Sequence, residues 1–383
     1  MASAFDGITV VDFTTTIAGP HCTRLMADLG ASVIKIETPD GDMMRTRPPL
    51  REGASAMFGQ LNAGKRSVAL DLKRDGDREA LLKIVAGADV VVENYRPGVT
   101  RRLGIDYATL SAGRDDLIYC SISGYGQTGP SASLPAYAPV IHAASGFDLA
   151  HIAYQPGRER PDYCGIFIAD VLAGTYAFGA VATAIAQRQK TGRGQSIDVS
   201  MLEAMLSLTL IEMQAAQFDM PPQPSRPLFG PVETADGYIN IAVASERTFD
   251  GMARAAGRED WFEDRRFKAY IDRRVNWGEL MDEFEAWSRT LDTATCLRVL
   301  ADNNVPAAAY RTVREAMADP QLADRGAFAD VADAGGAFRC LKPPFRMTGC
   351  DLQTGPRAPG LGEHTRDVLA EAGLSDVEID AIE

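Results

Sequence analysis

The sequence has little of what a metal centre or a disulfide framework needs. It contains four histidines and six cysteines in 383 residues. None of the cysteines forms a CxxC pair, and no histidines fall at the spacing of metal ligands. We therefore expect reduced thiols, mostly packed in the interior, and no bound metal.

Positive charge is also scarce. Lys and Arg number 39 against 52 Asp and Glu, which gives a net charge of −13, and no dense basic stretch is interleaved with aromatic residues. Nucleic acid is therefore not expected as a partner. No apolar run reaches the roughly 20 residues of a membrane helix, and the first residues, MASAFDG, lack the basic and apolar regions of a secretory signal. We expect no membrane contact and a cytoplasmic location.

The chain is rich in alternating strand-like and helix-like segments. Apolar residues make up 46% of it, enough for a large core, and its length predicts about two domains. Segments such as ITVVDF, SVIKI, DVVVEN and LIYCSIS alternate with helical ones, which predicts a parallel sheet covered by helices. Residues 220–231 hold five prolines and indicate a linker, and the sequence beyond them predicts a smaller α+β domain.

Two glycine-rich patterns resemble nucleotide-binding motifs but lack their context. GYGQTG, residues 124–129, is followed by Pro130 instead of a helix, so we interpret Gly126 as part of a backbone turn next to a site. GQLNAGKR, residues 59–66, has Arg66 in place of the hydroxyl residue of a phosphate-binding loop and precedes a strand. An ATPase is not predicted. Whether Lys65 and Arg66 meet an anion or form a solvated basic pair stays open at this point.

One acidic residue, Asp170, interrupts the apolar stretch YCGIFIADVLAGTYAFGA at residues 163–180. The pattern predicts a helix from Val171 to Gln187, ended by TGRG at residues 191–194. Position alone favours Asp170 as the N-cap of this helix, a role that contributes about 1 kcal/mol. A catalytic role for Asp170 requires other residues to converge on it.

Several segments that follow one another along the chain are more informative together than singly. They are VVDFTTTIAGPHCTRLMADLGASVIKIE, NAGKRSVALDL, DVVVENYRPGVTRRLG, CSISGYGQTGP, ADVLAGTYA with TGRGQSIDVSMLEAM, and APGLGEHTRDVL. In this order, and over nearly the whole chain, they resemble the class III coenzyme A-transferase family. That family includes formyl-CoA and carnitine CoA-transferases and the related α-methylacyl-CoA racemases.

The resemblance implies that Asp170 is the nucleophile. Its carboxylate would attack an acyl-CoA thioester to give a mixed anhydride, and the CoA thiolate would return to form an enzyme-CoA thioester. A carboxylic acid acceptor would then repeat the sequence. Because one thioester is exchanged for another, neither ATP nor a metal is needed. Coenzyme A thioesters are substrates, and no cofactor is permanently bound.

The positions that match the family's CoA contacts are Thr16, Ile17, Thr38, Lys65, Leu70, Asn94, Tyr95 and Arg102. Lys65 and Arg102 suit the nucleotide phosphates by their charge. Ile17 and Thr38 stand where formyl-CoA enzymes have Gln and Arg, and the chain lacks the glycine-rich loop of those enzymes. We therefore expect formate and oxalate to be poor substrates. A branched or dicarboxylic acid of four to six carbons is the expected acceptor, with transfer within one such acid left open.

The racemase branch is the closest alternative. Its histidine base would stand at Tyr137, and a tyrosine with a pKa of about 10 is a poor base at neutral pH, which favours a transferase. Tyr137 is interpreted as part of the acyl pocket, and His142 as a packed helix histidine. Glu246 either contacts the acyl group or is a carboxylate at a helix start. A non-catalytic acyl-CoA-binding protein is the third possibility.

The resemblance also implies an architecture. It predicts a large Rossmann-like α/β domain that binds CoA, built from residues 1–215 and 335–383. A linker at 216–231 and a small α+β domain at 232–334 complete the chain. Two chains are expected to form a homodimer of interlocked rings, for which long linkers are needed.

Overall fold

The chain divides into two compact units. The computed structural model describes residues 3–155, 157–218 and 228–382. The first unit comprises Met1–Asp148, Tyr163–Leu210 and Gln321–Glu383, and the second comprises Leu149–Asp162 and Ile211–Pro320. Residues 219–227, the middle of the linker predicted at 216–231, lie outside the described residues.

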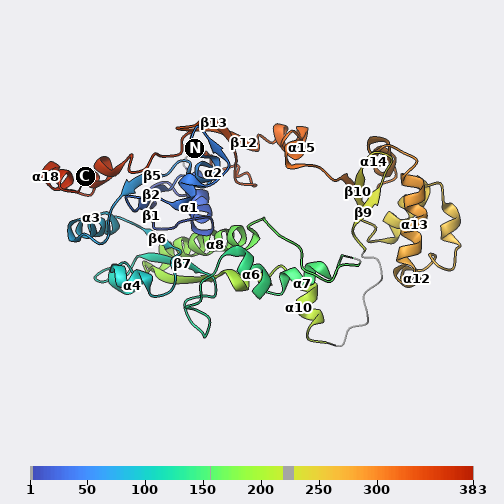
Figure 1. The fold of residues 1–383 in the computed structure, drawn as a ribbon, viewed down its shortest axis with the longest axis horizontal. Helices are drawn as coiled ribbons and strands as arrows, with labels where there is room; N and C mark the ends of the chain where they lie inside the picture. The colour runs from blue at the N-terminus through green and yellow to red at the C-terminus, as the bar shows by residue number, and fades with distance from the viewer. Residues whose placement is uncertain (1–2, 156, 219–227, 383) are drawn as a thin grey trace. The chain divides into compact units, whose positions relative to one another are not determined.

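A six-stranded parallel sheet forms the centre of the first unit (Figure 1). Its strands, in spatial order, are β5 (Arg66–Ala69), β2 (Ser32–Glu37), β1 (Thr9–Asp12), β6 (Val90–Glu93), β7 (Ile118–Ser123) and β8 (Gln195–Ser200). Every pairing is parallel, which confirms the prediction from the alternating segments. The strand order runs outward in both directions from β1 and β6. In such sheets ligands bind beyond the carboxyl ends of the strands at this reversal point.

Helices cover both faces of this sheet. Successive side chains of a strand point to opposite faces, so each strand contributes to two layers of packing. Val10 of β1 packs into one layer and its neighbour Val11 into the other. The first layer contains α1 (Ala18–Asp28), α6 (Ala138–Ala144), α8 (Ile168–Thr191) and α9 (Met201–Leu206). The second contains α3 (Asp75–Ala86), α5 (Tyr107–Leu110), α17 (Thr365–Glu371) and α18 (Asp376–Asp380). The C-terminal helices therefore pack on the sheet of the first unit.

Shorter elements complete the first unit. They are η1 (Met43–Thr46), β3 (Leu50–Arg51), β4 (Ala54–Ser55), α2 (Ala56–Asn62), α4 (Val99–Leu103), β12 (Phe328–Asp333) and β13 (Gly336–Leu341). Three helices, α7 (Phe147–Ile152), α10 (Leu210–Ala215) and α16 (Pro320–Asp324), cross a boundary between the units.

The second unit has its own aromatic core. A three-stranded antiparallel sheet is formed by β9 (Pro231–Glu233), β10 (Tyr238–Ile241) and β11 (Ala307–Ala309). The helical elements are α11 (Glu246–Ala255), η2 (Glu259–Phe262), α12 (Tyr270–Val275), α13 (Trp277–Ser288), α14 (Thr293–Asp302) and α15 (Val313–Met317). Phe249, Trp261, Phe267 and Phe284 are almost completely buried in this unit.

Helix α8 is 24 residues long and has a mean hydropathy of 1.5 in its most apolar window, so by length and composition alone it could cross a membrane. The window spans 18 residues, so it does not contradict the expectation that no apolar run reaches about 20 residues. One face of α8 carries small buried residues, Ala169, Ala173, Gly174 and Ala177, which pack into the layer that contains α1. A core helix with such a face passes the same test of length and composition.

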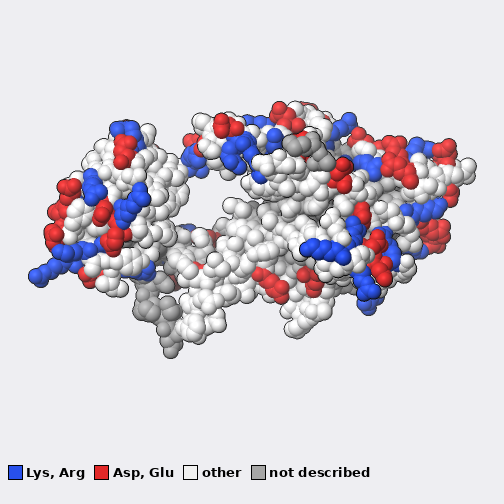
Figure 2. Space-filling view, turned by 180° about the vertical axis from the view of Figure 1, so that it is seen from behind, with Lys and Arg blue, Asp and Glu red and all other residues white. Residues whose placement is uncertain are grey.

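Large apolar side chains are exposed along α8 and around α9. They are Val171, Tyr176, Leu206, Leu208 and Leu210, each at least 40% exposed. On the face drawn in Figure 2, the middle of the first unit has few charged side chains, whereas both signs of charge gather toward α3, α17 and α18. A patch of exposed apolar side chains often marks a surface that binds a partner.

Helices α1 and α8 meet at Gly174. A Cβ atom at Gly174 would lie 2.4 Å from the carbonyl oxygen of Ala18, a backbone atom that cannot move aside. Gly179, further along the same helix, has no atom of a described residue within 4 Å of the equivalent position. The missing side chain at Gly174 therefore lets the two helices touch.

Gly174→Ala is expected to push α8 away from α1 and to destabilise the protein by about 1–3 kcal/mol, as overpacking does. Gly179→Ala is the matched control, and it is expected to stabilise the protein by about 0.5–1 kcal/mol, because glycine is the poorer helix former. Urea unfolding of the two variants measures both effects. Equal effects of the same sign would contradict the close approach at Gly174.

Candidate active site

Asp170 is the third residue of α8, so the N-cap role favoured by its position in the sequence is wrong. The helix starts at Ile168 instead of Val171, and its N-cap residue, Phe167, forms no side-chain cap bond. The helix can begin earlier because Nε2 of His142, on α6, accepts the backbone N–H of Ala169 at 3.2 Å. The Asp170 carboxylate is therefore not used to cap its own helix.

Burial raises the pKa of Asp170 to about 6, and the nearby backbone N–H of Ala18 opposes part of this shift. Ala18 is the first residue of α1, so the donor belongs to the first turn of a neighbouring helix. At neutral pH the carboxylate is ionised, but it is poorly solvated. A half-buried group with a perturbed pKa in a pocket is typical of a functional site.

Asp170 lines a pocket of about 270 Å³ in the first unit. The walls come largely from segments that follow the carboxyl ends of β1, β6 and β7, the edge of the sheet where ligands are expected. Four residues predicted from the sequence lie in this pocket with Asp170: Thr16, Asn94, Tyr95 and Tyr137. The side chain of Tyr137 is 61% exposed.

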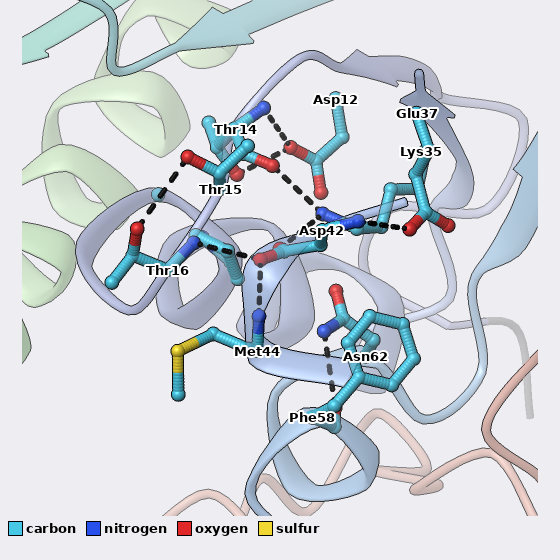
Figure 3. A network of polar contacts seen from close by, with 12 residues as sticks. Asp12, Thr14, Thr15, Thr16, Lys35, Glu37, Asp42, Met44, Phe58 and Asn62 are labelled. Atoms are coloured by element: carbon cyan, nitrogen blue, oxygen red, sulfur yellow. Dashed lines mark hydrogen bonds and ion pairs between the residues drawn. The ribbon is translucent and has the colours of Figure 1, made fainter. Parts of the chain in front are cut away.

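The loop that follows β1 is held from several sides (Figure 3). The Asp12 carboxylate accepts the backbone N–H of Thr14 at 2.8 Å and its hydroxyl at 2.5 Å. Nζ of Lys35 donates to the carbonyl oxygen of Thr14 at 2.7 Å. The Asn94 side chain accepts the N–H of Thr15 at 2.9 Å and donates to its carbonyl at 2.8 Å. Asn94 therefore both lines the pocket and fixes its wall.

Thr16 has a φ of 71°, in the left-handed region that a β-branched residue rarely adopts. Its N–H donates to Oδ1 of Asp42 at 3.4 Å, and Oδ2 of Asp42 is 3.1 Å from Nζ of the buried Lys35 (Figure 3). Strain of this kind persists only where the surroundings over-determine it. Here it sets how the chain enters α1, and so where the N–H of Ala18 points.

Lys65, predicted to contact phosphates, points into the interior, and its side chain is fully buried. Its Nζ donates at 2.7–3.1 Å to oxygens of Asp12, Pro20, Thr23 and Asn62. Burial lowers the pKa of Lys65 to about 8, although Asp12 opposes this. Burial alone would raise the pKa of Asp12, but Lys65 and Lys35 outweigh it and hold the value at about 2. We propose that Lys65 acts structurally, by holding β1 and α1 together.

Other predicted CoA contacts lie outside this pocket. The side chains of Ile17 and Leu70 are buried in the protein. Those of Thr38 and Arg102 are exposed. Gly126 has a positive φ of 85° and lies in a turn beside the carboxylate of Asp198.

Glu246 belongs to the second unit, where it is the first residue of α11. Ser245 caps this helix, and the Glu246 carboxylate forms an ion pair with Arg273. This is the helix-start arrangement that the sequence left open as one alternative.

Arg96 was not among the site residues predicted from the sequence. Among the described residues that line the pocket, Arg96 is the one Lys or Arg. The signal was present in NYRPG, where Arg96 directly follows the predicted contacts Asn94 and Tyr95. Within the described ranges, no group of three or more His, Cys, Asp or Glu side chains is placed to hold a metal ion.

A doubly wound α/β unit with a half-buried carboxylate in a pocket at its strand ends defines a small-molecule enzyme site. The chain belongs to CoA-transferase family III, whose family model matches residues 5–365. The prediction of a family III CoA-transferase is therefore confirmed, and acyl-CoA thioesters and carboxylic acids are its classes of substrate.

Individual relatives are similar over almost their full length. The chain is 33% identical to the succinyl-CoA:mesaconate CoA-transferase of Haloarcula hispanica, over 97% of each chain. It is 34% identical to the acetyl-CoA:oxalate CoA-transferase of Acetobacter aceti, over 94% of this chain and 93% of that one. The crystal structure of a CAIB/BAIF family protein from Brucella suis has a TM-score of 0.84 at 33% identity, covering 97% of this chain and 100% of that chain.

Lys65→Met is expected to destabilise the protein by about 3–5 kcal/mol, because it leaves the buried Asp12 without one of its cations. Arg66→Met is the control: Arg66 pairs with the largely exposed Glu371, and loss of such a pair costs at most about 1 kcal/mol. Urea unfolding measures both changes. A Lys65 variant as stable as the Arg66 variant, but with weakened CoA binding, would restore the phosphate role.

Asp170 also predicts a pH dependence of stability. Its pKa is raised from 3.8 to about 6 in the folded protein, so the folded state holds this proton more tightly than the unfolded chain. The resulting stability is present below pH 4 and is lost as the pH rises through 6. Asp170→Asn lacks this titration, so we expect its stability relative to wild type to increase between pH 4 and 7. A difference that stays constant with pH in urea unfolding would contradict the burial of the carboxylate.

Proposed function

We propose that Asp170 is the nucleophile of a transfer of CoA between an acyl-CoA thioester and a carboxylic acid. The observation that carries this proposal is the poorly solvated carboxylate, which lines a pocket and has a backbone N–H beside it. Desolvation makes a carboxylate a stronger nucleophile and raises its pKa toward neutrality. The group still ionises under ordinary conditions.

The reaction then runs through two kinds of covalent species. An oxygen of Asp170 attacks the thioester carbonyl, the C–S bond breaks, and a mixed anhydride and CoA thiolate result. The thiolate attacks the aspartyl carbonyl, which releases the donor acid and leaves an enzyme-CoA thioester. The acceptor carboxylate reverses these two steps. The N–H of Ala18 is placed to stabilise the negative charge that develops on the aspartyl carbonyl oxygen when the CoA thiolate or the acceptor carboxylate attacks it.

We propose that CoA lies along the carboxyl edge of the sheet, against Thr16, Asn94 and Tyr95. Arg102 and Arg96 supply positive charge for the phosphates of CoA. Because the chain has a net charge of −13, this positive charge must be concentrated locally. The strand order of the sheet supports the Rossmann-like description of this unit. A cytoplasmic location stays a prediction.

A dicarboxylic acid is the acceptor that we propose. Ile17 is buried and offers no polar group to a small acid, which argues against formate. One relative is named for succinyl-CoA and mesaconate, and another for acetyl-CoA and oxalate. Incubation of succinyl-CoA with a panel of mono- and dicarboxylic acids, followed by mass spectrometry of new thioesters, identifies the acceptor. Preference for formate or oxalate would contradict the expectation of an acceptor acid of four to six carbons.

A racemase is not favoured by the arrangement of possible bases. Tyr137 is exposed in the pocket, and a phenol is a poor base at neutral pH. The Nε2 lone pair of His142 accepts the N–H of Ala169, so it is not free to take a proton from a substrate. The proposed transferase needs neither group as a base.

Asp170→Asn and Asp170→Ala are expected to lower CoA transfer by more than about 1,000-fold and to leave acyl-CoA binding within about tenfold, since the lost group makes and breaks bonds. Hydroxylamine added to wild type with succinyl-CoA should convert Asp170 to its hydroxamate, which peptide mass spectrometry detects. A binding protein without catalysis would give no hydroxamate. Substantial transfer by either variant would remove Asp170 from the nucleophile role.

We further propose the interlocked homodimer implied by the family resemblance. The exposed apolar residues of α8 and α9 support it, because a second chain is the kind of partner that would cover them. Sedimentation at micromolar concentration is expected to show a dimer that persists on dilution. A stable monomer with full activity would contradict this proposal.

A further inference from the structure

Helix α8 begins without a cap of its own. The first N–H groups of a helix have no partner within the helix and need acceptors from elsewhere. The side chain of the N-cap residue, Phe167, is apolar and cannot accept a hydrogen bond from these groups. The N–H of Ala169 finds its acceptor on a different helix, in the imidazole of His142 on α6.

The contact is built into the interior of the protein. His142 is 1% exposed and Ala169 is completely buried. The His142 ring also packs against Phe147, with ring centroids 5.9 Å apart. The imidazole is therefore held in place by packing as well as by its hydrogen bond.

The direction of the hydrogen bond fixes the chemical state of the ring. Because Nε2 accepts, a neutral His142 carries its proton on Nδ1, which is buried and has no hydrogen-bond partner among the described residues. Burial lowers the pKa of His142, although Asp148 opposes this, and the neutral form agrees with its role as an acceptor. An unpaired buried N–H is unfavourable, because it has lost its hydrogen bonds to water and gained none in the protein. A histidine that served stability alone would be a poor choice here.

Ala169 directly precedes Asp170, so the peptide that His142 holds is next to the nucleophile. On the other side, the N–H of Ala18 lies near the carboxylate itself. Resting on the proposed function, we propose that His142 is a positioning residue, which fixes the first turn of α8 from α6 and so holds the Asp170 carboxylate in its attacking position.

The test compares three substitutions that differ in where they place an acceptor. His142→Gln can put an oxygen near the place of Nε2. His142→Asn is polar but too short to reach Ala169, and His142→Met has similar bulk without a comparable acceptor. Each variant is mixed with succinyl-CoA and hydroxylamine, and peptide mass spectrometry follows the rate of hydroxamate formation at Asp170. The succinyl-CoA concentration that gives half the maximal rate is measured in the same assay.

The expected result is a rate within about threefold of wild type for His142→Gln, and a fall of about tenfold or more for His142→Asn and His142→Met, since small displacements of a reacting group are costly. The half-saturating succinyl-CoA concentration should stay within about twofold in all three variants. His142 contacts the helix that carries the nucleophile and is not proposed to contact the substrate. Normalisation to the folded fraction, from circular dichroism, separates positioning from loss of protein. If the Met variant does not fold, the Gln and Asn variants alone decide.

Two results would overturn the inference while leaving the proposed function intact. One is Asn and Met variants as fast as wild type, and the other is a Gln variant as slow as the Asn variant. If wild type itself forms no hydroxamate at Asp170, the proposed function fails, and the role of His142 fails with it.

Discussion

The meeting of α1 and α8 is the contact on which the site depends. A carboxylate that attacks a thioester must be poorly solvated and still reachable, and those demands conflict for a group on the protein surface. Here the first turn of α8 is pressed against the first residue of α1, because Gly174 has no side chain to keep the helices apart. Asp170 thereby loses part of its solvent, lies near the backbone N–H of Ala18 and keeps access to the pocket.

The position of the Ala18 N–H is set by buried charged side chains that the substrate does not need to contact. Asp12, Lys35 and Asp42 are buried around the loop that leads into α1, and together they hold Thr14 and Thr16 in place. Buried ion pairs contribute little net stability, since desolvation offsets their attraction. Their function here is geometric: they keep Thr16 in an unfavourable backbone conformation that the loop would otherwise leave.

Much of this architecture could be predicted from the sequence. The alternation of apolar segments indicated the parallel sheet, because buried parallel strands have a recognisable pattern. The ordered segments indicated the family, and with it Asp170. The direction of the Lys65 side chain could not be predicted, because its partner Asp12 is 53 residues away and a buried lysine looks like an exposed one in a sequence. The start of α8 was missed for a similar reason: its acceptor, His142, lies 27 residues earlier on another helix.

The central claim, that an oxygen of Asp170 forms the covalent bond to the acyl group, can be tested by following that oxygen. In the proposed reaction, an acceptor acid labelled with oxygen-18 attacks the enzyme-CoA thioester and leaves one labelled oxygen on Asp170 when its own acyl group departs with CoA. The account predicts oxygen-18 in the Asp170 carboxylate after turnover, localised by peptide fragmentation, and in the donor acid released in later cycles. Transfer of CoA without label at Asp170 would contradict it.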